Sequence, residues 1–230
     1  MHAEALTDPN EILRDAYALE AKLEVWAATL PTEWVYQVIR LQKNSYVVPT
    51  LHGAVRPYDG CYHLYPQMNI TTGWCHYRVS RILINKVILD CLRPRVEETA
   101  PPSAWIDRCR NIRNTMRQLA ADICASVPHV FGILGSHPAR PAEIVRGTCA
   151  GGYLLLLPLF TAGCVEGPTH PLRQWIIERF QVIAHTMGIG HAFADIEILR
   201  NKPGIVEWMD DLDREFDVVS SATFYDKTSG

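Results

Sequence analysis

The chain lacks the paired cysteines that would identify a structural zinc site or a disulfide framework. It has seven cysteines, and none of them makes a Cys-x-x-Cys pair. Structural zinc usually takes two thiolates from one turn of chain, and a disulfide framework usually has an even number of cysteines. We therefore expect no metal site, and we expect reduced cysteines in an intracellular protein.

The chain also lacks an excess of positive charge. It has 22 Lys and Arg against 25 Asp and Glu, a formal net charge of -3, and its basic residues are dispersed. A protein that binds the phosphate backbone of DNA usually shows a basic patch and a positive excess. We therefore expect no autonomous DNA binding.

Long apolar runs are missing as well. The longest, residues 153–162, is interrupted by Pro158 and is much shorter than the roughly 20 residues that a membrane helix needs. The first residues contain no basic stretch followed by an apolar core, so a secretory signal is not expected. We predict no membrane span.

No stretch alternates between apolar and polar residues as a half-buried strand would, and the apolar residues instead recur three and four apart. Residues 47–68 are rich in Pro, Gly and Tyr and are expected to form a long irregular connection. The sequence thus predicts an all-α fold, one compact domain over residues 1–219, with a flexible polar tail at 220–230. The six or seven expected helices cover residues 9–30, 72–92, 103–127, 149–160, 171–187, 191–199 and 204–216.

The first of these helices has clear start and stop signals. Asp8 and Pro9 are typical of a helix N-terminus, and Pro31 ends the periodic pattern. The pattern predicts one buried apolar stripe made of Ile12, Ala16, Leu19, Leu23, Trp26 and Leu30.

Four segments carry a resemblance to a known family. The first is Trp74-x-x-Tyr77-Arg78-x-x-Arg81-Ile82, and the second is Asp-Ile-Cys-Ala-Ser-Val-Pro at 122–128. The third is Gly-Tyr-x-Leu-Leu-x-Pro-Leu-x-x-Ala-Gly at 152–163. The fourth is Trp-Ile-x-Glu-Arg at 175–179, followed by Met-Gly-Ile at 187–189. With these segments in order, the chain resembles the C-terminal helical regulatory region of the fungal-specific zinc binuclear cluster transcription factors.

The resemblance implies a helical regulator without its own DNA-binding zinc cluster. The DNA contacts and zinc ligands of that family have no counterpart in this sequence, so none is carried over. The expected protein is a nuclear regulator of secondary metabolism that acts through protein partners, with possible control by an apolar small molecule. An alternative within the same resemblance is that the chain is a fragment of a longer transcription factor.

A second hypothesis is an enzyme that evolved from the same scaffold, because fold does not determine function. Cyclase, pericyclase or isomerase chemistry needs little more than a shaped apolar cavity and one or two polarising donors. The expected enzyme is cytoplasmic and needs no cofactor. Its candidate catalytic residues are His76, Arg78, Arg81, His185 and His191.

Arg78 and Arg81 lie three residues apart in a predicted helix and therefore share a face. One interpretation is that they line a ligand cleft; the other is that they are buried and pair with Asp122 or Glu178. Aromatic residues are typical of ligand-cavity walls and equally of cores. The candidate ligand-binding residues are Trp74, Tyr77, Arg78, Arg81 and Trp175.

His185 and His191 flank a Gly-containing turn, and Asp195 follows four residues after His191. Such a set suggests a metal site or a proton relay. Its spacing, however, matches no helix-borne ligand pair, so ordinary histidines at a helix corner are the favoured interpretation.

Overall fold

The computed structural model describes residues 8–41, 47–98, 101–134, 149–210 and 213. Most of them are helical, so the prediction of a predominantly α fold is confirmed. The α-helices in these ranges are α1 Pro9–Ala28, α2 Met68–Val96, α3 Ser103–Val130, α4 Cys149–Gly163, α5 Pro171–Thr186 and α6 His191–Asn201.

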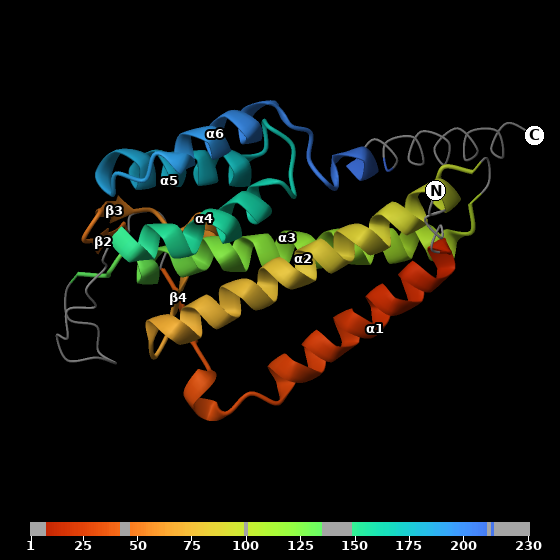
Figure 1. The fold of residues 1–230 in the computed structure, drawn as a ribbon, viewed down its shortest axis with the longest axis horizontal. Coiled ribbons are helices and arrows are strands. Elements are labelled where there is room, and N and C mark those ends of the chain that lie inside the picture. The colour runs from red at the N-terminus through yellow and green to blue at the C-terminus, as the bar shows by residue number, and fades with distance from the viewer. Residues whose placement is uncertain (1–7, 42–46, 99–100, 135–148, 211–212, 214–230) are drawn as a thin grey trace, which may run out of the picture.

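The two longest helices, α2 and α3, pack along each other and form the centre of the molecule (Figure 1). Helix α1 lies against α2 on one side, and α4 packs against both α2 and α3 on the other. Helices α5 and α6 form an outer layer next to α4 (Figure 1). None of the helices within the described ranges is long and apolar enough to cross a bilayer.

Four short strands correct the expectation that the chain contains none. Strands β1 Gln37–Arg40 and β4 Cys61–Leu64 pair antiparallel, as do β2 Val48–Thr50 and β3 Gly53–Val55. Residues 47–68 are therefore not an irregular connection throughout. Strands of three or four residues are too short to produce a clear alternating pattern, which explains why the sequence did not reveal them.

Helices α2 and α3 run further than predicted because each passes a proline. Pro94 lies in the last turn of α2 and Pro128 in the last turn of α3. A proline there removes one backbone hydrogen bond. The cost is offset by burial of apolar residues on both sides of the proline, among them Leu92 and Val96 in α2 and Val130 in α3. Helix α3 begins at Ser103, and the residue before it, Pro102, provides no side-chain capping bond.

The N-terminus of α1 is as predicted, because the side chain of Asp8 accepts the backbone N–H of Asn10. Its buried stripe is confirmed only in part. Ala16 is buried and Leu23, Trp26 and Leu30 are half-buried, as predicted. Leu19, however, is 51% exposed, and Leu13 is buried in place of Ile12. The helix is rotated so that Glu20 faces α2, where its carboxylate accepts hydrogen bonds from Arg81 and Asn85. Pairing of a carboxylate with a partly buried guanidinium has outweighed the apolar pattern.

The C-terminal half follows the predicted order. Helix α5 begins at Pro171, and Gly188, with φ of 73°, provides the left-handed turn before α6. Residues 207–210 are helical, as expected for the start of the last helix, whose remaining predicted residues lie largely outside the described part. The predicted tail at 220–230 lies outside it entirely.

A buried arginine joins the three C-terminal helices. Arg173 of α5 is completely buried, and its guanidinium donates to the carbonyl oxygens of Gly163 at 2.7 Å and Leu199 at 2.8 Å. It also donates to the carbonyl of Lys202. These carbonyls lie at the ends of α4 and α6, where the helix itself leaves them without partners. Arg173 therefore fixes α4 and α6 relative to α5.

We expect Arg173→Met to lower the free energy of unfolding by at least about 3 kcal/mol, because several buried carbonyls lose their donor together. Urea denaturation followed by circular dichroism measures the change. Arg200→Met is the control, since Arg200 is exposed and pairs only with Glu197 in the described structure; it should change stability by no more than about 0.5 kcal/mol. Equal stability of the two variants would contradict the role of Arg173.

Candidate functional site

A buried arginine stands at the junction of α2, α3 and the chain segment that begins with β4. Only 1% of Arg78 is exposed. One terminal nitrogen, Nη1, donates to the hydroxyl of Tyr65 at 2.7 Å and to that of Ser126 at 3.1 Å. The other, Nη2, lies 3.3 Å from Nδ1 of His63. A buried cation of this kind is tolerated only when it has such partners.

The direction of each hydrogen bond follows from the chemistry of arginine, which only donates. His63 must accept through Nδ1, so its ring proton is on Nε2, which lies 3.9 Å from Oδ1 of Asp122. The hydroxyl of Ser126 donates to the backbone carbonyl of Asp122 at 3.0 Å. The hydroxyl of Tyr65 has two neighbouring acceptors for its proton, the hydroxyl of Ser126 at 2.8 Å and Nδ1 of His63 at 3.1 Å.

His63 is neutral in this arrangement. Burial, reinforced by the positive charge of Arg78, lowers the pKa of His63 from 6.5 to about 3. A protonated ring would have lost its acceptor for Arg78 and would bring a second cation into the core.

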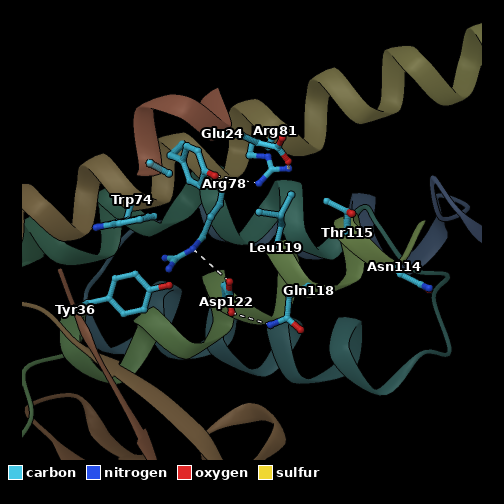
Figure 2. A pocket seen from close by; sticks show the side chains of 12 residues that line it. Glu24, Tyr36, Trp74, Arg78, Arg81, Asn114, Thr115, Gln118, Leu119 and Asp122 are labelled. Atoms are coloured by element: carbon cyan, nitrogen blue, oxygen red, sulfur yellow. Dashed lines mark hydrogen bonds and ion pairs between the residues drawn. The ribbon is translucent and has the colours of Figure 1, made fainter. Parts of the chain in front are cut away.

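Next to Arg78 the surface opens into a cleft of about 660 Å³ between α1, α2 and α3 (Figure 2). We call it the Arg78 cleft. Its walls are formed by residues of α1, α2, α3 and the segment before β1, namely Glu24, Ala27, Tyr36, Trp74, Tyr77, Arg78, Arg81, Asn114, Thr115, Gln118, Leu119 and Asp122.

Asp122 of α3 lies on the wall of the Arg78 cleft facing Arg78 (Figure 2). Its side chain is 25% exposed, and its Oδ2 is 3.9 Å from Nε of Arg78. Its other oxygen, Oδ1, accepts a hydrogen bond from Gln118 at 3.0 Å. Burial raises the pKa of Asp122, although the charge of Arg78 and the hydrogen bond from Gln118 act in the opposite direction.

Aromatic rings pack around the cationic side chain of Arg78. The guanidinium carbon is 5.0 Å from the centre of the Tyr36 ring and 5.5 Å from that of Trp74, distances at which a cation is attracted to a ring face. Trp74 is held in place by a hydrogen bond of 2.9 Å from its Nε1 to the carbonyl of Trp34.

Arg81 is one turn further along α2 and has a different environment. It donates to Glu20, to Glu24 at 2.8 Å and to the hydroxyl of Tyr77 at 3.0 Å. Its charge is thus neutralised by two carboxylates of α1. These ion pairs join α1 to α2 at the rim of the Arg78 cleft (Figure 2).

Of the residues predicted from the sequence, Trp74, Tyr77, Arg78 and Arg81 come together in this cleft. Both interpretations of the arginines hold in part: Arg78 is buried opposite Asp122, and it also lines a cleft. Within the described residues, Glu178 pairs with Arg179 and not with either of them.

Trp175 lies outside the Arg78 cleft, so the structure separates it from the other four predicted ligand-binding residues. It lines a separate cleft of about 530 Å³ with Arg179. Its Nε1 donates to the carbonyl of Arg56 at 2.8 Å. The tryptophan is on α5, whereas the Arg78 cleft is bounded by the N-terminal helices.

The three candidate histidines are also outside the Arg78 cleft. His76 is exposed on α2. At the α5–α6 corner, His185 packs against Phe193, and Nε2 of His191 is 3.8 Å from Asp195. Among the described residues, no group of three or more His, Cys, Asp or Glu side chains is arranged to hold a metal ion.

The site includes residues that the sequence did not single out, chiefly Tyr36, His63 and Ser126. Ser126 had one local signal, its position four residues after Asp122 on the same helix face. Tyr36 and His63 had none, because they reach Arg78 only through the antiparallel pairing of β1 and β4.

Comparisons with known proteins do not identify the chain: no family model, no curated protein and no solved structure matches it. The resemblance to the transcription factor family remains a prediction from the four segments.

The low pKa of His63 predicts a pH dependence of stability. Between pH 6.5 and about 3, the unfolded chain binds a proton at His63 that the folded protein does not, so the free energy of unfolding falls as the pH is lowered. Each pKa unit corresponds to about 1.4 kcal/mol. Urea titrations from pH 7 to pH 4 should therefore show a shallower pH dependence for His63→Gln than for the wild type.

His76→Gln is the control, because it removes a histidine from an exposed position of α2. It should keep the steeper dependence of the wild type. If His63→Gln and the wild type lost stability in parallel over this range, His63 would not be buried in the neutral form.

Proposed function

We propose that this protein is a ligand-controlled regulator of gene expression in fungal secondary metabolism, and that its ligand binds in the Arg78 cleft. In this proposal the protein works in the nucleus through a protein partner and does not bind DNA by itself. The observation that carries the proposal is the Arg78 cleft, where three aromatic side chains lie beside several polar and charged side chains. Small-molecule sites use polar groups placed among aromatic side chains to orient a ligand.

The polar groups are held in fixed positions before any ligand arrives. Tyr65, Ser126 and His63 hold the guanidinium of Arg78, and Gln118 holds Asp122. A preformed site of this kind loses little conformational entropy when a ligand binds. Its cost is the burial of a charge, which a protein would not need for stability alone.

Helix α1 gives a physical route from the ligand to a partner. It contributes Glu24 and Ala27 to the Arg78 cleft, while Leu19 and Val25 are exposed elsewhere on the same helix. A ligand that changes the contact between Glu24 and Arg81 would also move the surface that carries Leu19 and Val25. A regulator needs this kind of connection between ligand and partner.

A second candidate is an enzyme that uses the same cleft. It is favoured by the proximity of Asp122, whose pKa burial raises, to the donor Arg78. Perturbed acids beside a cation in a cleft are typical of catalytic sites. Of the five catalytic candidates, only the two arginines line the cleft, so in this alternative Arg78 would polarise the substrate and Asp122 would transfer the proton.

Deletion of the gene, with transcripts and metabolites profiled together, separates the two candidates. For a regulator we expect a set of transcripts to fall along with their metabolic product. Steady transcripts with accumulation of one intermediate or isomer would contradict the regulator and favour the enzyme.

Complementation of the deletion strain tests whether the Arg78 cleft is responsible. Asp122→Asn changes the charge of the cleft wall with almost no change in shape, and should fail to restore the transcripts. Glu197→Gln makes the same chemical change on the exposed surface of α6 and should restore them fully. Full restoration by Asp122→Asn, at equal protein level, would show that the cleft is not the regulatory site.

A further inference from the structure

We propose that the Arg78 cleft binds a neutral aromatic molecule through a hydroxyl group placed between Arg78 and Asp122. This inference rests on the proposed function, because it names the chemical class of the ligand for the same cleft. It is drawn from three features of the cleft: a donor and an acceptor at a distance that one oxygen atom can bridge, a balance of charge and the arrangement of aromatic rings.

The hydrogen-bonding position lies between Nε of Arg78 and Oδ2 of Asp122. These atoms are 3.9 Å apart, too far for a direct hydrogen bond. No hydrogen bond to an acceptor among the described residues engages this Nε, whereas Nη1 donates two hydrogen bonds and Nη2 donates one. An oxygen about 2.8–2.9 Å from both atoms would accept from Arg78 and donate to Asp122.

A hydroxyl group is the simplest chemical group that accepts and donates through one atom. A carbonyl or ether oxygen would accept the hydrogen bond from Nε of Arg78 but would leave Oδ2 of Asp122 without a donor. An ammonium group would do the reverse and would bring its charge against that of Arg78. The pair therefore selects a hydroxyl.

The balance of charge favours a neutral ligand. Two cations, Arg78 and Arg81, and two carboxylates, Glu24 and Asp122, line the cleft. The ring faces that attract a cation in other proteins are already next to Arg78, at Tyr36 and Trp74. Arg81, which would attract an anion, is already paired with Glu24 and Glu20. A charged ligand would have to displace one of these internal partners.

The walls favour an aromatic ligand. Trp74 and Tyr36 lie next to Arg78, and the buried Leu119 adds an apolar surface from α3 (Figure 2). Tyr77 lines the same cleft beside Arg81. Aromatic rings gain stability from stacked or edge-to-face contacts with such side chains. The volume of about 660 Å³ is within the range of sites for small molecules.

Two probes test the inference: they share one ring system and differ in whether the oxygen carries a hydrogen or a methyl group. 2-Naphthol can both accept and donate, whereas 2-methoxynaphthalene can only accept. Isothermal titration calorimetry with the full chain at pH 7 measures both affinities. We expect 2-naphthol to bind about tenfold more tightly, because the ether leaves the buried acceptor on Asp122 unpaired.

Asp122→Leu removes the acceptor and should abolish this difference, with 2-naphthol falling to the affinity of the ether. Glu197→Gln, on the exposed surface of α6 and outside the cleft, is the control and should keep the tenfold preference. Equal binding of both probes to the wild type would overturn the hydroxyl inference and leave the cleft as an apolar ligand site. Absence of binding by both probes would overturn the inference and count against the proposed ligand site itself.

Discussion

The guanidinium of Arg78 must find hydrogen-bond acceptors inside the protein, and the arrangement around the cleft follows from that requirement. Its partners come from three places in the chain: His63 in β4, Tyr65 just after it, and Ser126 on α3. An unpaired buried charge would cost several kcal/mol, so these segments are held in one position relative to α2. The small β1–β4 sheet matters because it delivers two of the partners.

The same requirement produces the functional character of the cleft. Three partners accept hydrogen bonds from the two terminal nitrogens, and Nε faces Asp122 at 3.9 Å. A donor and an acceptor are thus fixed side by side within an aromatic wall. Both candidate functions use this pair, one to hold a ligand that controls a partner and the other to polarise a substrate.

Much of the helical order was predictable, and the limits have physical causes. Periodicity and the prolines at positions 9 and 171 located α1 and α5 well, because local rules determine helix starts. The rotation of α1 was not predictable, since it depends on the pairing of Glu20 with Arg81 across two helices. Arg78, Arg81, Trp74 and Tyr77 were predictable as neighbours on one helix, whereas His63 and Tyr65 reach the site only through tertiary pairing. That Trp175 lines a different cleft from the other four candidates was not predictable, because an aromatic residue in a family-like segment says nothing about which cleft it lines.

The most direct test of the central claim is to observe the Nε–H group of Arg78 by ¹H–¹⁵N NMR, assigned by comparison with Arg78→Lys. If the guanidinium is buried and fixed, this proton gives a separate signal that exchanges slowly with water, and it shifts when 2-naphthol is added. A signal that exchanges as fast as those of exposed arginines would contradict the burial of Arg78. A signal that stays unchanged when 2-naphthol saturates the Arg78 cleft would contradict its role in binding.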